Sequence, residues 1–266
     1  MSLFILIVFI VKSIMYIFSR VFFASDEDDK RVIQFEPRTQ PRQQGLISEV
    51  PDTLRLTTDM GEYMYVSKNW DFANAPPDEV TPQAHKAFFS RFRSGAWHMN
   101  KIKTLSPQKS DDAPYRRIPD DERIIHWRIK PGDAVIFSWK TFVGMSDAIQ
   151  IRSQFSWQLS SLVFGRMFYV VASVDADSPV DGSLLLAARG SDGIRETSSP
   201  SNSPDQLLAW QTTTRFQLHA SLTMRNVYRS GIQIRARDSD LAVMHLNDNK
   251  RKSGAASFLK YFLVPV

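Results

Sequence analysis

The stretch IIHWRIKPGDAVIFSW, residues 124–139, decides the fold class of this chain. It contains two short apolar runs, 124–129 and 134–139, on either side of Lys130-Pro131-Gly132-Asp133. Proline, glycine and aspartate in close succession are typical of a tight turn between strands. Similar runs, rich in β-branched and aromatic residues, recur along the chain with turn residues between them. The pattern predicts a mainly β protein with an antiparallel sandwich or jelly-roll-like domain.

Further strands are expected on both sides of this stretch. The same criteria assign strands to residues 53–57, 62–66, 148–152, 166–172, 183–187, 207–210, 215–222, 231–237, 241–246 and 257–264. The first two of these should form a hairpin across Asp59-Met60-Gly61. Alternating apolar residues, such as Val135, Phe137, Tyr169 and Val171, should point inward between two sheets.

One short soluble helix is expected within the β pattern, at residues 82–93. Thr81 is suited to cap its first turn, Pro82 suits its first helical position, and Gly95 suits its end. The following region, residues 101–121, is rich in Pro, Ser, Lys and Asp. That composition predicts a long exposed loop.

The N-terminal segment predicts a transmembrane helix. Residues 2–23 are mainly apolar, and roughly 20 such residues are what a helix needs to cross a bilayer. A cleavable signal peptide is the main alternative, but no basic residue precedes the apolar core and Phe22-Phe23-Ala24 is a poor cleavage site. A buried soluble helix is a second alternative. We therefore expect a single-pass membrane protein.

Polar residues of this segment gather on one side of the predicted helix. Lys12, Ser13, Tyr16, Ser19 and Arg20 are related by three-, four- and seven-residue steps. A lysine near the bilayer centre is costly, so we expect this stripe to contact another membrane protein subunit or membrane lipid. The basic residues lie toward the C-terminal end of the helix, which favours a cytoplasmic soluble domain.

Four segments follow from these patterns. Residues 1–24 form the anchor. Residues 25–52, which contain three prolines, form an extended linker or an arm laid over a neighbour. Residues 53–122 form the N-terminal part of the soluble domain, with the helix and the long loop. Residues 123–266 form the β-sandwich domain.

Composition restricts the chemistry of the chain. Hydrophobic residues make up 43% and charged residues 23% of the 266 residues, as in folded globular proteins. The net charge of +5 is spread among acidic residues rather than clustered, so we expect no nucleic-acid partner. The absence of cysteine excludes disulfides, thiolate zinc sites and cysteine nucleophiles.

Sequence motifs for catalysis or cofactor binding are absent. There is no nucleophile elbow, no phosphate-binding loop and no dinucleotide-binding glycine motif. The five histidines have no local metal-ligand spacing, and His126, His219 and His245 are expected to be structural residues of strands. We predict no catalytic residue, no cofactor and no metal site. The six tryptophans are expected mainly to fill the space between sheets.

Residues 129–222 resemble one repeat of a known family. The resemblance lies in the turn 130–133, the run 142–146, the glycine-led strand 165–171 and the glycine-led strand 182–190. In this order they resemble a unit of the altered inheritance of mitochondria protein 24 family, and 206–210 resembles part of a second unit. The resemblance implies a pseudo-repeated β sandwich with an organisational role. The anchor, the helix and the long strand connections depart from the family pattern.

Three functions fit the sequence. The leading hypothesis is a non-enzymatic, membrane-anchored structural or accessory subunit of a larger membrane assembly, with other membrane protein subunits as partners and a homo-oligomer as one option. The first alternative is a membrane-tethered module that binds carbohydrate or lipid through exposed aromatic residues. The second alternative is a cryptic hydrolase. Mild-detergent extraction with size measurement would separate the first two.

Overall fold

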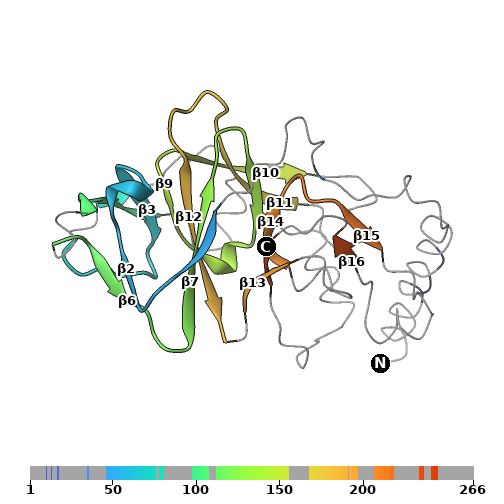
Figure 1. The fold of residues 1–266 in the computed structure, drawn as a ribbon, viewed down its shortest axis with the longest axis horizontal. Helices are drawn as coiled ribbons and strands as arrows, with labels where there is room; N and C mark the ends of the chain where they lie inside the picture. The colour runs from blue at the N-terminus through green and yellow to red at the C-terminus, as the bar shows by residue number, and fades with distance from the viewer. Residues whose placement is uncertain are drawn as a thin grey trace.

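The computed structural model describes the central part of the chain in most detail. The described residues are 10, 13, 17, 35, 46–75, 78–80, 98–107, 112–155, 168–190, 192–196, 207–218, 234–236 and 241–244. Two large antiparallel sheets dominate them (Figure 1). The chain is therefore mainly β, as the sequence predicts.

The first large sheet has seven strands in the order β1-β7-β12-β9-β3-β5-β4. Its strands are β1 (Ile47–Val50), β3 (Tyr63–Ser67), β4 (Asp78–Val80), β5 (Met99–Lys103), β7 (Glu122–Ile129), β9 (Phe142–Ser146) and β12 (Gly182–Arg189). Strands from both of the predicted segments 53–122 and 123–266 thus share one sheet.

The second large sheet has six strands in the order β10-β11-β8-β14-β17-β13. They are β8 (Ala134–Phe137), β10 (Ile149–Phe155), β11 (Phe168–Val174), β13 (Gly193–Glu196), β14 (Leu207–Gln211) and β17 (Leu241–Met244). Two small sheets complete the described structure: β2 (Thr53–Arg55) with β6 (Tyr115–Arg117), and β15 (Phe216–Leu218) with β16 (Ile234–Ala236).

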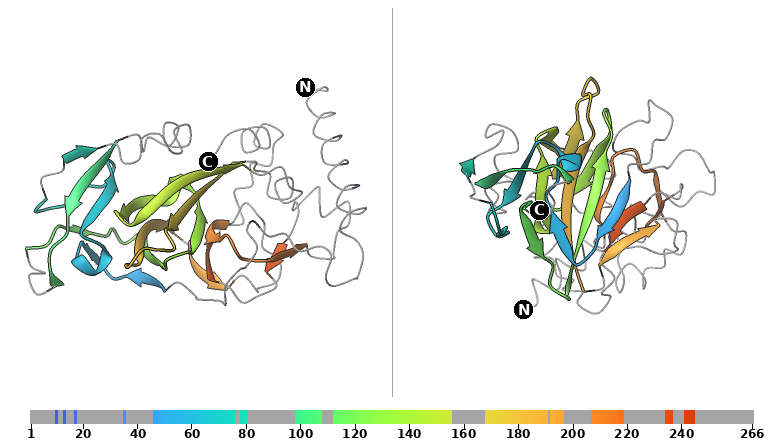
Figure 2. Two further views of the ribbon diagram at one scale, coloured as in Figure 1. Left: turned by 90° about the horizontal axis from the view of Figure 1, so that it is seen from above. Right: turned by 60° about the vertical axis from the view of Figure 1, so that its left-hand side comes forward.

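The sheets stack as layers, with apolar side chains between them. The main core lies between the two large sheets and contains Trp127 and Leu184 from one sheet and Val135 and Phe137 from the other. A second cluster lies between the seven-stranded sheet and the β2-β6 pair, and a third lies on the other face of the six-stranded sheet. The two small sheets consequently lie at opposite ends of the described structure (Figures 1 and 2).

One prediction about side-chain direction is wrong in part, because the six-stranded sheet is buried on both faces. Val135 and Phe137 do point between the large sheets, but Tyr169 and Val171 belong to the cluster on the outer face. The β8-β11 register places Val170 opposite Phe137, so the neighbours of Val170 point the other way. Because β8 is buried along its whole length, alternation in the sequence does not distinguish its two faces.

Two predictions for the segment 53–121 are wrong. Strands β2 and β3 form no hairpin, because β2 pairs with β6 whereas β3 pairs with β5 and β9. A short 3-10 helix, η1 (Thr58–Met60), lies between them in place of the expected hairpin turn. The expected loop at 101–121 includes the end of β5 and all of β6, and its Ile102 and Ile118 are buried.

Several predicted features lie outside the described residues. These include the helix at 82–93, the last strand at 257–264, and Lys12, Tyr16, Ser19 and Arg20 of the polar stripe. Ile10, Ser13 and Ile17 have helical conformation, and Ser13 is half-buried. Within the described residues, no helix has the length and apolar character needed to cross a bilayer.

Candidate functional site

Four strand ends meet at one end of the seven-stranded sheet. β7 begins at Glu122 and β9 begins at Phe142, whereas β3 ends at Ser67 and β12 ends at Arg189. Because the neighbouring strands β7-β12, β12-β9 and β9-β3 are all antiparallel, these starts and ends lie at the same end of the sheet. Residues far apart in the sequence are thereby brought together.

A cavity of about 280 Å³ opens at this sheet end. We call it the sheet-end pocket, and it is lined by residues of these four strand ends together with Asn69, Trp70, Arg116 from β6, and the 3-10 helix η3 (Trp139–Thr141). Ligand pockets typically measure roughly 300–1,000 Å³. The sheet-end pocket is therefore slightly smaller than a typical ligand pocket and suits a small ligand.

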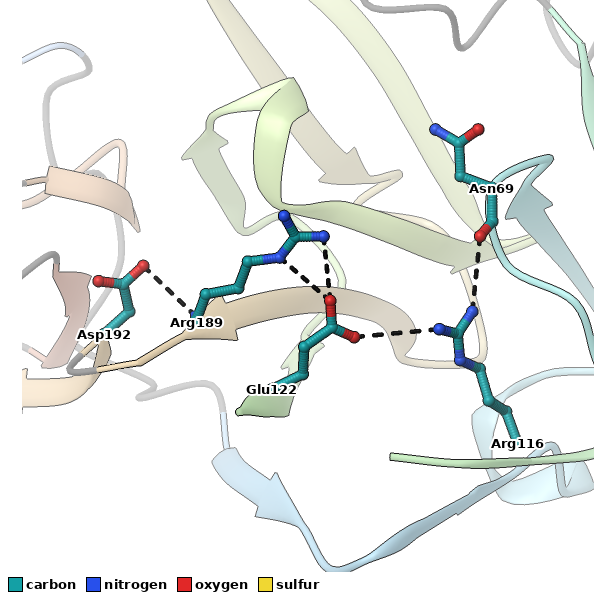
Figure 3. A network of polar contacts seen from close by, with 5 residues as sticks. All are labelled: Asn69, Arg116, Glu122, Arg189 and Asp192. Carbon is teal, nitrogen blue, oxygen red and sulfur yellow. Dashed lines mark hydrogen bonds and ion pairs between the residues drawn. The ribbon is translucent and has the colours of Figure 1, made fainter. Parts of the chain in front are cut away.

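Glu122 is the centre of a polar network in the pocket (Figure 3). Its Oε1 accepts a hydrogen bond from Nε of Arg189 at 3.1 Å and lies 3.0 Å from Nη2 of the same residue. Its Oε2 lies 4.0 Å from Nη2 of Arg116, which is an ion pair too long to be a hydrogen bond. The Glu122 side chain is 11% exposed and that of Arg189 is 74% exposed. The network thus leads from a buried carboxylate to the surface.

The sequence register explains why Glu122 and Arg189 meet. They are direct cross-strand neighbours at the ends of β7 and β12. The turn that follows β12 is closed by Asp192, whose carboxylate accepts a hydrogen bond from the backbone N–H of Arg189 at 3.4 Å. Opposite charges placed directly across an antiparallel pair stabilise its register. This pairing has a structural role even without a ligand.

Arg116 is positioned by stacking rather than by a close ion pair. Its guanidinium carbon lies 3.9 Å from the centroid of the Trp70 ring, which is a cation–π arrangement. Its side-chain polar contacts with described residues are long: 3.5 Å from Nη1 to the backbone oxygen of Asn69, and 4.0 Å to Glu122. A guanidinium carries five N–H donors. Arg116 therefore has ample donor capacity for a ligand.

The pocket has an excess of positive charge. Arg116, Lys140 and Arg189 line it, and Glu122 is the acidic residue among its lining side chains. An arginine that presents its planar fork recognises a carboxylate or a phosphate through two parallel hydrogen bonds. The arrangement therefore favours an anionic ligand.

Aromatic side chains form the apolar wall of the pocket. Trp70, Trp139 and Phe142 line it. The rings of Trp139 and Phe142 meet edge to face, with centroids 4.8 Å apart. Both residues also belong to the core between the large sheets, so their positions are fixed by packing. Because these three side chains are only 5–7% exposed and Arg116 covers the Trp70 ring, they fix the shape of the pocket and present little apolar surface to a ligand.

His126 and Ser183 form a second polar pair, on neighbouring strands. His126 Nε2 lies 3.0 Å from Ser183 Oγ, which is the distance that a histidine-activated serine nucleophile would require. Ser183, however, is 1% exposed, and its backbone N–H donates to the buried Ser146 hydroxyl at 2.9 Å. Neither His126 nor Ser183 lines the sheet-end pocket. We interpret the pair as a structural hydrogen bond.

Burial changes the protonation of His126. Desolvation is the main cause that lowers its pKa to about 4, the positive charge of Arg128 lowers it further, and Asp59 opposes both. His126 is thus neutral at physiological pH. Within the described residues, no group of histidine and acidic side chains is arranged to hold a metal ion.

The sequence did not indicate the sheet-end pocket. Of the predicted contact residues, Ser13 is described at a position remote in the chain from the pocket, and Lys12, Tyr16, Ser19 and Arg20 lie outside the described residues. The pocket residues come from separate segments, and no local spacing connects them. The available signal was the concentration of polar residues and tryptophans at predicted strand ends.

Comparisons with known proteins give no family assignment. No family model matches the chain, and no curated protein matches it. The resemblance of residues 129–222 to the altered inheritance of mitochondria protein 24 family stays a prediction. Among solved structures, the chain is similar to protein SPYM3_0169 from Streptococcus pyogenes, with 10% identity, a TM-score of 0.41, and coverage of 86% of this chain and 96% of that chain.

Proposed function

We propose that this chain is a non-enzymatic binding module, held at a membrane by its N-terminal segment, that takes a small anionic ligand in the sheet-end pocket. The observation that carries the proposal is Arg116, which is fixed on Trp70 and has only long polar contacts with described residues. A donor group held in place before binding reduces the ordering cost of binding. This proposal develops the binding alternative that the sequence left open.

The non-enzymatic part of the proposal rests on the sequence and on the chemistry of the pocket residues. The sequence contains no motif for a nucleophile or a phosphate-binding loop. In the pocket, the Glu122 carboxylate is engaged by Arg189 and faces Arg116. The partners of this carboxylate are thus two guanidinium groups, which it helps to position.

The test is thermal unfolding of the full-length chain in mild detergent, with and without glucuronate, acetate or inorganic phosphate. A ligand that binds the folded state raises the melting temperature in proportion to its occupancy. We expect at least one of these anions to stabilise the wild type, and Arg116→Met to abolish the effect. The matched control is Arg117→Met, which removes an exposed arginine outside the pocket lining from the same strand. No stabilisation by any of the three anions, or equal stabilisation of Arg116→Met, would contradict the proposal.

A second candidate function is the accessory subunit of a membrane assembly. Phe35 favours it, because this residue of the predicted arm packs on the outer face of the six-stranded sheet. An arm attached to the β domain would couple the domain to a membrane anchor, and the polar stripe from Lys12 to Arg20 would then contact partner subunits. Size measurement of the complex after mild-detergent extraction tests this function; a lone monomer would contradict it.

A further inference from the structure

We infer that the sheet-end pocket binds a phosphate group, as free phosphate or as a phosphate ester, in preference to a carboxylate. This inference rests on the proposed binding function and specifies its ligand. Two features of the pocket carry it: the net charge of its side chains, and the number of cationic side chains that share one small cavity.

The side chains that line the pocket carry a net charge of plus two. Arg116, Lys140 and Arg189 are cationic, and Glu122 is the acidic residue of the lining. A single carboxylate contributes one negative charge, whereas a phosphate ester carries about −1.5 to −2 at pH 7. A phosphate group therefore comes closer than a carboxylate to balancing the charge of the pocket.

The three cationic side chains come from three separate elements. Arg116 belongs to β6, Lys140 to η3 and Arg189 to the end of β12. A phosphate ester presents three acceptor oxygens, whereas a carboxylate presents two. Arginine binds phosphate through paired hydrogen bonds, and lysine binds it as a point charge. A phosphate group thus offers one oxygen to each of the three cationic side chains, and a carboxylate does not.

Glu122 holds the guanidinium groups in place before a ligand binds. Its Oε1 lies 3.1 Å from Nε and 3.0 Å from Nη2 of Arg189, and its Oε2 lies 4.0 Å from Nη2 of Arg116 (Figure 3). The Arg189 side chain is 74% exposed, so its Nη1 group extends beyond the pair with Glu122. Donors that are held in position reduce the ordering cost of binding.

The rest of the lining and the size of the cavity suit a small polar ligand. Ser67 and Asn69 also line the pocket, and side chains of both types donate and accept hydrogen bonds. A phosphate group has only a few non-hydrogen atoms, so a cavity of about 280 Å³ also has room for a small ester group. Because Arg189 is exposed, a longer substituent would leave the pocket beside it. The same phosphate chemistry could therefore come from a soluble phosphate compound or from a lipid headgroup.

The experiment is isothermal titration of the full-length chain in mild detergent with inorganic phosphate, glycerol 3-phosphate, acetate and glucuronate. We expect inorganic phosphate or glycerol 3-phosphate to bind at least about tenfold more tightly than either carboxylate, because the phosphate group engages a third cationic side chain. A carboxylate that bound as tightly as both phosphate compounds would overturn the inference and leave the proposed anion-binding function intact. Binding of none of the four ligands would overturn both.

Lys140 provides a variant that keeps this test independent of folding, because its side chain is exposed. Lys140→Met should weaken binding of glycerol 3-phosphate about fivefold or more and change binding of acetate by less than about twofold. The matched control is Lys68→Met, an exposed lysine between the lining residues Ser67 and Asn69 that does not itself line the pocket. Equal effects of the two substitutions would reflect general surface charge and would overturn the inference.

The source of the phosphate group is identified by titration with inorganic phosphate, glycerol 3-phosphate and the short-chain lipid dihexanoyl phosphatidate in the same detergent. Tightest binding of the phosphatidate assigns a lipid headgroup, and tightest binding of either of the others assigns a soluble ligand. Arg116→Met should abolish binding of all three. Binding that persisted in this variant would lie outside the pocket and would contradict the inference.

Discussion

Phe35 packs edge-on against Tyr169, with ring centroids 4.7 Å apart and ring planes inclined by 67°. Phe35 belongs to the Pro-rich arm that precedes the β domain, and Tyr169 lies in β11 of the six-stranded sheet. Trp210 lies beside them, with its ring centroid 6.0 Å from that of Phe35. Through Phe35, the predicted linker or arm therefore contributes a side chain to the outer cluster of its own chain.

This contact predicts a stability effect for Phe35→Ala. Phe35 is 7% exposed, and truncating a buried phenylalanine costs about 3 to 5 kcal/mol. We expect a cost within that range, because Phe35 packs in a cluster of buried side chains. Urea denaturation measures the effect. The matched control is Phe155→Ala, since Phe155 is 42% exposed and should cost about 1 kcal/mol or less; equal effects of the two substitutions would contradict the packing of Phe35.

Gly182 provides a second stability prediction. A Cβ atom at this position would lie 2.5 Å from Val174 Cγ2 and 2.6 Å from Ile149 Cγ1, both at buried residues. Gly182→Ala should therefore destabilise the protein by about 1 to 3 kcal/mol through overpacking. At Gly193 the nearest atom, Glu49 Oε1, would be 3.8 Å from an added Cβ. Gly193→Ala should change the free energy of unfolding by less than about 0.5 kcal/mol, and thermal unfolding compares the two.

His126 predicts a pH dependence of stability. Its pKa is lowered from 6.5 to about 4 in the folded state, mainly by burial. Below pH 6.5 the unfolded chain binds a proton at His126 that the folded chain excludes, so stability falls as the pH falls from about 6.5 to about 4. The effect should reach roughly 3 kcal/mol. His126→Gln should flatten this part of the profile in urea denaturation across the pH range, and an unchanged slope would show that His126 is not responsible.

The polar stripe of the N-terminal segment predicts that membrane insertion and complex assembly respond differently to the same substitutions. Replacing Lys12 and Arg20 together by leucine should preserve or improve retention in the membrane fraction after a carbonate wash, because it removes charge from an apolar segment. It should reduce the size of the complex extracted in mild detergent. A complex of unchanged size, with the variant at full occupancy, would mean that these side chains only extend to the membrane–water interface and contact no partner subunit.

The β class and most strand positions followed directly from the sequence. The turn at 130–133 and the apolar runs around it correspond to β7 and β8, because a tight turn and short apolar runs are local features. The pairing of strands did not follow in the same way. β2 pairs with β6 and β3 pairs with β9, and such long-range partners are set by packing rather than by local spacing.

The pocket was less accessible to prediction than the fold. The sequence pattern places Arg116 in the expected loop 101–121, and Glu122 lies between that loop and the strand expected at 124–129. Their proximity depends on the antiparallel order of β7, β12 and β9 and on the β2-β6 pair. Without those pairings, no spacing in the sequence connects Trp70, Arg116 and Arg189. The sequence also does not indicate toward which face of the sheet the Tyr169 side chain points, because the six-stranded sheet is buried on both faces.

The central claim is that the ligand binds at the sheet-end pocket. Hydrogen–deuterium exchange of the full-length chain, with and without saturating inorganic phosphate, locates binding most directly. We predict slower exchange in the segments 67–70, 116–122, 138–142 and 187–190, which contain the residues that line the pocket, and no change around His126 or β15. Protection that appeared elsewhere, or saturating ligand that left these four segments unchanged, would contradict the account.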